Sequence, residues 1–116
     1  VLMSAPCLQG LRPWIVQRIS AAFIAMVILY FVFAIVQFET FDFAHWYGWL
    51  ASPGNNIAMA LFMIAVLWHT WIGVRDVILD YVPPVVLRMF IYTLVMSVLL
   101  GSGLWGLRAL FKLHVA

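Results

Sequence analysis

Three long runs of this sequence contain no Asp, Glu, Lys or Arg: residues 19–38, 43–74 and 89–107. A helix that crosses the hydrocarbon core of a membrane needs about 20 mostly apolar residues. The middle run contains a Ser-Pro-Gly-Asn-Asn cluster at 52–56, which is typical of a turn, so its spanning part is expected to begin at residue 57. The sequence therefore predicts an all-α membrane protein with three transmembrane helices, over roughly residues 17–38, 57–80 and 87–110.

The composition excludes most other classes of protein. Of the 116 residues, 67% are apolar and only 9% are charged. Soluble domains are about 45–50% apolar and about 25% charged, and a chain of this length has too little interior to bury the excess. The net charge of +2 is too small for a nucleic-acid-binding surface, and the single cysteine excludes an internal disulfide. We expect one membrane-anchor domain, residues 1–116, that contacts lipid and no nucleic acid.

Lysine and arginine predict the orientation, because they are enriched in cytoplasmic loops. Two arginines precede the first span and two flank the connection between the second and third spans, whereas residues 39–56 contain no basic residue (Arg12, Arg18, Arg75, Arg88). Arg108 and Lys112 in the tail favour the opposite orientation, but more weakly. We expect a cytoplasmic N-terminus and a periplasmic C-terminus. The chain has no Arg- and Ser-rich presequence, which favours the bacterial inner membrane over the mitochondrial one.

The loop expected outside the membrane is rich in aromatic residues. Residues 41–50 include two tryptophans and a tyrosine, which favour the membrane interface, and are expected to form a short helix on the outer surface. The polar side chains of this loop are expected to be solvated or interfacial, and His114 in the tail is expected to be solvated (Glu39, Asp42, His45).

Small residues recur on the first and third predicted spans, where they indicate close helix contacts. In the third span they repeat at four-residue spacing: Ser97 with Gly101, and Ser102 with Gly106. In the first span they share a face with an arginine: Arg18, Ala21, Ala22 and Ala25. The partner of these faces is expected to be another helix of this chain or a second protein chain.

One face of the second predicted span carries small and ionisable side chains. Steps of three and four residues place seven of them on one stripe: Ala58, Phe62, Ala65, His69, Gly73, Asp76 and Asp80. With a helical rise of about 1.5 Å per residue, His69 lies about 18 Å from residue 57, near the middle of a core about 30 Å thick. An ionisable side chain at this depth is a candidate functional site.

Three roles are open for His69 from the residues alone. The imidazole could bind a haem iron, relay protons or hydrogen-bond a neighbouring helix. Haem suits the surroundings. Gly73 lies one turn from His69 and leaves an open surface for a flat macrocycle, and Arg18, near the same membrane boundary, supplies a cation for a propionate. A proton relay needs further titratable groups at similar depth in the other spans, which contain none. A single histidine supplies one axial ligand, so we expect the second from another chain.

The second span is predicted to end at the cytoplasmic boundary, because the Pro-Pro pair at 83–84 cannot continue a helix. Tyr81 then lies at the boundary beside Asp80. One interpretation is an interfacial tyrosine next to a carboxylate that is ion-paired with Arg75 or Arg88. The other is a hydrogen-bond donor to a membrane-dissolved ligand such as a quinone, oriented by Asp80.

These residues resemble a known family. The order His69, Gly73, Asp80, Tyr81 corresponds to a His-x3-Gly-x6-Asp-Tyr pattern, and it is similar to the smaller, hydrophobic membrane anchor of succinate dehydrogenase (succinate:quinone oxidoreductase, respiratory complex II). The segment Trp-Ile-Val-Gln-Arg-Ile-Ser-Ala at 14–21 resembles the start of the first helix in that family. The resemblance extends over essentially the whole chain.

The resemblance implies a specific set of roles. His69 would be one axial ligand of a haem b shared with the larger cytochrome b anchor of the complex, and Arg18 would contact a propionate. Tyr81 would hydrogen-bond ubiquinone, and Asp80 would pair with a basic residue of a partner. Succinate oxidation, FAD and the iron–sulfur clusters would belong to the flavoprotein and iron–sulfur subunits, so this chain would hold no catalytic residue for succinate. The alternatives are a haem-free structural anchor and a small proton-conducting transport subunit.

Overall fold

The computed structural model describes residues 5–113, and the side chains of residues 11–113. Four helices make up this part of the chain, which contains no strand: α1 (Ala5–Val36), α2 (Phe43–Ala51), α3 (Pro53–Tyr81) and α4 (Val85–Phe111). Three of them are long and apolar enough to cross a membrane: α1 from Leu11 onward, α3 and α4. The prediction of an all-α protein with three transmembrane helices is confirmed, as is the short helix after the first span.

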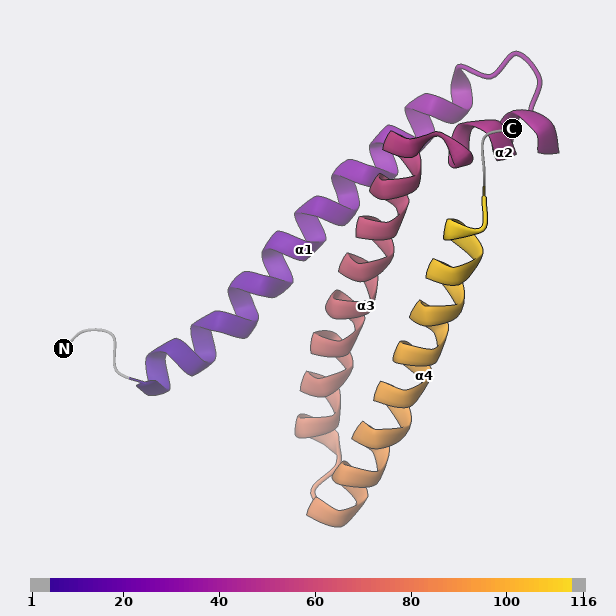
Figure 1. Cartoon of the computed structure of the whole chain (residues 1–116). Helices are drawn as coiled ribbons and strands as arrows, with labels where there is room; N and C mark the ends of the chain where they lie inside the picture. The colour runs from indigo at the N-terminus through magenta and orange to yellow at the C-terminus, as the bar shows by residue number, and fades with distance from the viewer. Residues whose placement is uncertain (1–4, 114–116) are drawn as a thin grey trace.

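Helix α3 is the central element (Figure 1). It packs against α1 on one side and α4 on the other, and α2 packs against its beginning, whereas α1 and α4 have no extensive contact in the described part of the chain. Figure 1 shows α1 and α3 close together near α2 and diverging toward the start of α1. The start of α1 and the turn between α3 and α4 lie at one end of the molecule, and α2 lies at the other.

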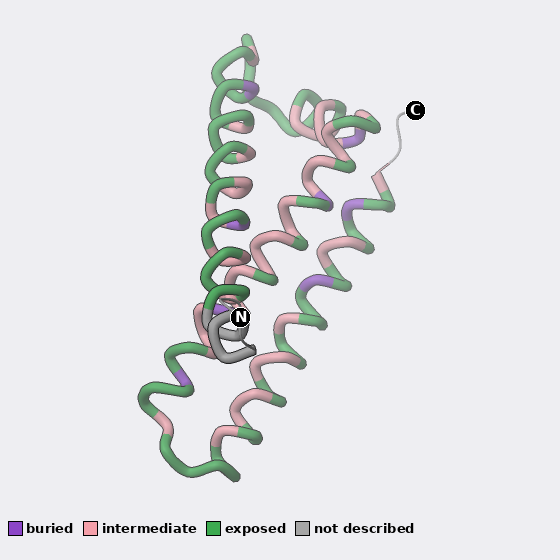
Figure 2. The backbone as a smooth tube through the Cα atoms, turned by 90° about the vertical axis from the view of Figure 1, so that its left-hand side faces the viewer, coloured by how far each residue is buried: buried purple, intermediate pink, exposed green. Residues whose placement is uncertain are grey.

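Few residues are buried within this chain (Figure 2). No large side chain among those described is fully buried, and many large apolar ones are exposed along all three long helices. Such surfaces are stable against lipid tails, which are as apolar as the side chains themselves. The exposed faces are therefore suited to contact lipid or other membrane helices.

The corner between α2 and α3 differs from the prediction. Of residues 52–56, expected to form a turn, only Ser52 lies between the helices, and α3 begins at Pro53, whose missing N–H removes no helical hydrogen bond in the first turn. The Asn55 and Asn56 side chains donate to the carbonyls of Trp49 and Leu50, at 3.0 and 3.3 Å. These carbonyls at the end of α2 would otherwise lack partners. Turn-forming residues thus join two helices with almost no loop.

The first helix is longer at its start than the predicted 17–38. It begins at Ala5 and continues through Pro13. A proline removes one backbone hydrogen bond, but membrane helices tolerate this loss when neighbouring groups satisfy the freed carbonyl. The other end of α1 lies at Val36, and a polar connection leads from there to α2.

Glycines make the contact between α3 and α4, but not all of the predicted ones. A methyl group added at Gly106 would overlap Met63 of α3, and one at Gly103 would overlap Leu67. By contrast, Gly101 has no side chain within 4 Å of that position and Ser97 is exposed. Ser97 and Gly101 therefore contact no other helix of this chain, because that side of α4 faces away from α3, and a contact with a second chain stays a prediction.

Candidate cofactor-binding cleft

A cleft of about 630 Å³ lies between α1 and α3. It is in the region where the two helices diverge (Figure 1). Its walls come from the first half of α1 and the second half of α3: Pro13, Trp14, Gln17, Arg18, Ala21, His69, Arg75 and Asp76. The cleft therefore brings together two predicted site residues, His69 and Arg18, that are far apart in the sequence.

The middle of the small and ionisable stripe of α3, from Phe62 to Gly73, faces α1. Phe62 makes an edge-to-face contact with Phe31 of α1, with ring centroids 5.6 Å apart. Two turns later along α3, His69 contacts Ser20 of α1. Trp49 of α2 also contacts Phe31, at 5.4 Å between centroids. These aromatic contacts hold α1, α2 and α3 together at one end, and the cleft opens beyond them.

His69 is held by a hydrogen bond to the opposite helix. Its Nδ1 lies 3.0 Å from the hydroxyl oxygen of Ser20, and that hydroxyl lies 3.1 Å from the backbone carbonyl of Gln17. The other ring nitrogen, Nε2, has no hydrogen-bond partner among the described residues. An imidazole with one nitrogen anchored and the other unpartnered in a cleft is arranged to bind a metal centre.

Gly73 was predicted to leave an open surface, but the Gln17 side chain of α1 lies beside it. A Cβ at Gly73 would lie 3.7 Å from the Gln17 amide nitrogen, so the surface beside this glycine faces a side chain of α1. The Gln17 side-chain oxygen is buried and has no hydrogen-bond partner in the described part of the chain. A buried acceptor without a donor is unfavourable by about 1–3 kcal/mol. A bound molecule in the cleft could supply that donor.

The charges at the cleft differ in how they are paired. Arg75 donates to the carboxylate of its neighbour Asp76, with Nη2 and Oδ1 2.9 Å apart. Arg18 is exposed and its guanidinium lies over the ring of Trp14, 5.5 Å from the centroid. No described carboxylate pairs with it. Arg18 is therefore the cation that this cleft offers to an anionic group.

Asp80 and Tyr81 lie outside the cleft, at the end of α3. Helix α3 ends at Tyr81, as the following prolines predicted. The Tyr81 side chain is 78% exposed, Asp80 is also exposed, and neither has a hydrogen-bond partner among the described residues. At about 1.5 Å per residue, Tyr81 is roughly 18 Å along the helix from His69. The structure thus separates the predicted quinone residues from the predicted haem residues.

The expected pairing of Asp80 with Arg75 or Arg88 is wrong within this chain. Arg75 pairs with Asp76 instead. Arg88 donates to the backbone carbonyls of Val82 and Leu79, at 2.7 and 3.4 Å. Carbonyls at the end of a helix lack helical donors, so a nearby arginine satisfies them. Asp80 is left free to contact another molecule.

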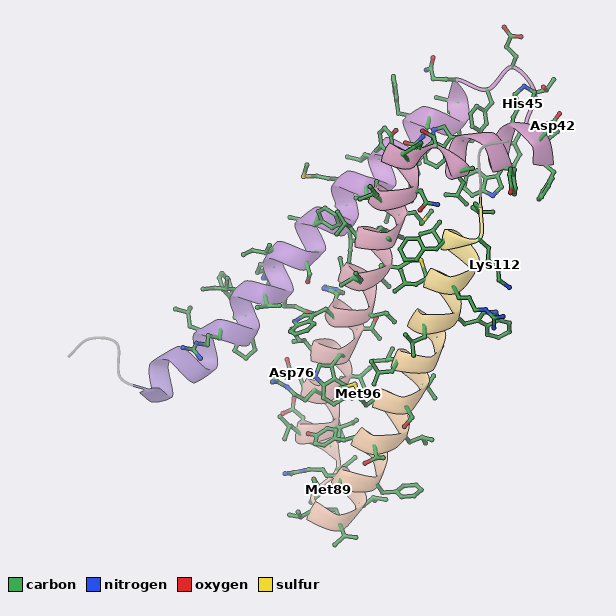
Figure 3. All side chains as sticks on the ribbon, in the orientation of Figure 1. Asp42, His45, Asp76, Met89, Met96 and Lys112 are labelled. Carbon is green, nitrogen blue, oxygen red and sulfur yellow. The ribbon has the colours of Figure 1, made fainter. Side chains whose placement is uncertain are left out.

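Asp42 and His45, at the start of α2, form a helix cap. Figure 3 shows Asp42 and His45 together at the start of α2, at the opposite end of the bundle from Asp76. Asp42 accepts a hydrogen bond from the His45 backbone N–H at 2.8 Å, and its carboxylate lies 2.6 Å from Nδ1 of the same residue. The backbone bond first, and then the side-chain bond, lower the pKa of Asp42. Asp42 is exposed, as the sequence predicted, and is in addition a helix cap. His114 lies outside the described residues.

A second cavity lies between α3 and α4, with a volume of about 380 Å³. Apolar side chains and one glycine line it, among them Trp68, Trp71 and Met96, the last of which is labelled in Figure 3. It contains none of the predicted site residues. In the described part of the chain, no group of three or more His, Cys, Asp or Glu side chains is close enough to hold a metal ion.

The sequence did not identify Ser20 and Gln17 as site residues. Both lie in the segment that resembles the family, and they are three residues apart on one face of α1. Polar residues within an apolar membrane span by themselves indicate a candidate functional site. Only the packing of α1 on α3, however, places Ser20 against His69.

Two comparisons link the chain to known proteins. The model of a family described as "Succinate dehydrogenase/Fumarate reductase transmembrane subunit" matches residues 8–104. The chain is also 26% identical over 103 residues to the succinate dehydrogenase hydrophobic membrane anchor subunit of Coxiella burnetii (strain RSA 493 / Nine Mile phase I). That alignment covers 89% of this chain and 90% of the relative. The family match includes the cleft and the end of α3.

Proposed function

Because this chain belongs to the family of succinate dehydrogenase/fumarate reductase transmembrane subunits, we propose that it is a haem b-binding and quinone-binding anchor of succinate dehydrogenase. It is an integral membrane protein with three spanning helices. The similarity to a membrane anchor of succinate dehydrogenase over nearly the whole chain supports this choice within the family.

The residues of the α1–α3 cleft fit a haem. The observation that carries the proposal is His69, whose Nδ1 is bound to Ser20 and whose Nε2 has no described partner. Arg18 supplies a cation that has no described carboxylate partner and could pair with a propionate. The volume of about 630 Å³ lies within the range of about 300–1,000 Å³ that is typical of ligand pockets.

Each residue of the cleft has a distinct role in this proposal. His69 is one axial ligand of haem b, and Arg18 holds a propionate. Haem b, when bound, accepts and releases one electron at a time. Gly73 contributes a surface without a side chain beside Gln17, at a distance where an added Cβ would make only ordinary van der Waals contact. The cleft contains one described histidine, so the second axial ligand comes from the larger cytochrome b anchor.

Tyr81 and Asp80 form the quinone-binding part of the proposal. Both are exposed at the end of α3, and neither side chain makes a hydrogen bond to a described residue of this chain. The Tyr81 hydroxyl donates a hydrogen bond to a carbonyl oxygen of ubiquinone. Asp80 pairs with a basic residue of a partner protein and so fixes the position of the neighbouring tyrosine.

The remaining chemistry belongs to the partner chains. The flavoprotein holds FAD and oxidises succinate, and the iron–sulfur protein carries electrons to the quinone. This chain contributes membrane attachment, haem ligation and quinone contact, and no catalytic residue for succinate. Its N-terminus and the turn after Tyr81 lie in the cytoplasm, and the membrane is the bacterial inner membrane.

Replacing His69 with Ala tests the haem assignment. The purified complex of the natural chain should give a reduced-minus-oxidised spectrum with a b-type α band. The His69→Ala complex should lose the low-spin form, because the iron loses one of two imidazoles. His45→Ala is the matched control, since this histidine contacts the Asp42 cap and lies outside the cleft.

An unchanged low-spin spectrum in His69→Ala would contradict the ligand assignment. A natural complex without a b-type band would instead support a haem-free structural anchor. Proton conduction by the isolated anchor in vesicles, abolished by His69→Ala, would support a transport function.

A further inference from the structure

Ser20 is the most deeply buried polar residue among residues 11–113, with 9% of its surface exposed. It lies on the face of α1 that contacts α3, and its hydroxyl oxygen makes two contacts. One is to the Gln17 carbonyl at 3.1 Å, and the other is to Nδ1 of His69 at 3.0 Å. In the first contact Ser20 is the donor, and the direction of the second depends on the tautomer of His69.

A serine hydroxyl has one hydrogen to donate and two lone pairs to accept with. The backbone carbonyl of Gln17 can only accept, so the hydroxyl hydrogen of Ser20 is directed to it. Ser20 then presents only a lone pair to His69, and Nδ1 must donate. A neutral imidazole has a single ring N–H, so Nε2 carries the free lone pair.

We propose that Ser20 is a positioning residue that fixes His69 in the Nδ1–H tautomer and orients its ring so that Nε2 binds the haem iron. This inference rests on the haem ligation proposed above. A ligand histidine that donates its second N–H to an oxygen is held in orientation and becomes a more basic ligand. A more basic ligand stabilises ferric over ferrous iron, so Ser20 lowers the reduction potential of the haem.

No other described group takes the place of Ser20. Asp76 lines the same cleft, but its carboxylate is engaged by Arg75 at 2.9 Å. Gln17 also lines the cleft, and its buried side-chain oxygen has no partner among residues 11–113. The acceptor for His69 is therefore a neutral hydroxyl whose own hydrogen is bound to the α1 backbone.

The test uses the assembled complex with substitutions at Ser20. In Ser20→Ala, the reduction potential of the haem, measured by spectroelectrochemical titration, should rise, and the low-spin electron paramagnetic resonance signal should shift. Ser20→Thr keeps the hydroxyl and should restore the natural potential. Ser97→Ala is the matched control, because the Ser97 hydroxyl donates to its own helix, to the Thr93 carbonyl at 2.8 Å.

A haem-loaded Ser20→Ala complex with the natural potential and signal would overturn the inference. If the Ser20→Ala complex fails to assemble, the same measurement is made on Ser20→Cys, whose thiol is close in size to the hydroxyl and accepts a hydrogen bond only weakly. An unchanged haem potential in Ser20→Cys also overturns the inference. The proposed haem ligation fails separately, through an unchanged low-spin spectrum in His69→Ala.

Discussion

Tyr81 shows what an exposed side chain at a helix end can and cannot contribute. With 78% of its surface exposed and no described partner, its hydroxyl adds little to the stability of this chain. A loss of function on removing that hydroxyl would therefore report a contact with another molecule. The proposed contact is a quinone carbonyl in a partly dehydrated pocket.

Tyr81→Phe keeps the ring and deletes only the hydroxyl. Loss of a hydrogen bond to quinone should cost about 1–3 kcal/mol, which corresponds to roughly a 5- to 150-fold lower rate of quinone reduction. Succinate oxidation with an artificial acceptor that bypasses the anchor should be unchanged. The rates are compared at equal amounts of assembled complex.

Tyr92→Phe is the matched control, because it makes the same change on α4, at a buried hydroxyl that has no described hydrogen-bond partner. It should leave both rates unchanged. Natural quinone reductase activity in an assembled Tyr81→Phe complex would assign Tyr81 to the membrane interface alone.

At the scale of the element, the short helix α2 is stabilised by side chains that cap both of its ends. This helix has 9 residues, and isolated helices shorter than about 12–15 residues are marginal in water. Asp42 caps it by accepting the His45 backbone N–H. Asn55 and Asn56 bind carbonyls at its other end. Side chains at both ends thus compensate for the shortness of the helix.

Asp42→Ala should speed hydrogen–deuterium exchange in the first turn of α2, because the cap is lost. Asp42→Asn retains a capping oxygen and should restore much of the protection. Glu39→Ala, in the same loop but without a described hydrogen bond, should have no effect. Equal exchange in natural protein and Asp42→Ala would show that packing alone holds α2.

The cap also predicts a pH dependence. Hydrogen bonds from His45 lower the pKa of Asp42 in the folded state, so the carboxylate form is favoured by folding. The resulting stabilisation of α2 is complete above the ordinary aspartate pKa of about 3.9 and is lost as the pH falls through the lowered folded value. A carboxyl titration by nuclear magnetic resonance should place the midpoint of Asp42 below that ordinary value, and a midpoint at or above it would contradict the cap.

At the scale of the whole molecule, the three long helices do not enclose a core of their own. Helix α3 contacts both neighbours, but α1 and α4 have no extensive contact in the described part of the chain. The α1–α3 cleft and the exposed faces of the long helices (Figure 2), which carry many large apolar side chains, therefore depend on lipid or partner chains to cover them. An arrangement of this kind suits one component of a larger membrane complex.

The orientation of this arrangement in the membrane can be tested by cysteine labelling, with Cys7 replaced by Ser. Thr40→Cys, exposed in the connection between α1 and α2, should react with an impermeant reagent in intact cells, because its loop has no basic residue. Val82→Cys, in the turn after α3, should react only after the membrane is permeabilised. The reverse pattern would place Asp80 and Tyr81 on the outer side.

The sequence by itself determined the helical class, the three spans and the face of α3 that carries His69. These follow from local physics, because apolar runs of sufficient length must form helices in lipid and residues at steps of three and four share a face. The end of α3 followed equally directly, since proline cannot continue a helix. Helical spacing alone was therefore enough to place His69 and Gly73 on one face of α3, whereas the structure showed that this part of the stripe faces α1.

Only the tertiary structure decided what those side chains meet. Ser20 and His69 are 49 residues apart, and their contact depends on how α1 crosses α3. Likewise Arg75 binds Asp76 and Arg88 binds backbone carbonyls, although charge alone allowed either to pair with Asp80. The physical reason is that helical periodicity fixes the direction of a side chain around its own axis, whereas partners are fixed by the distance and crossing of separate helices.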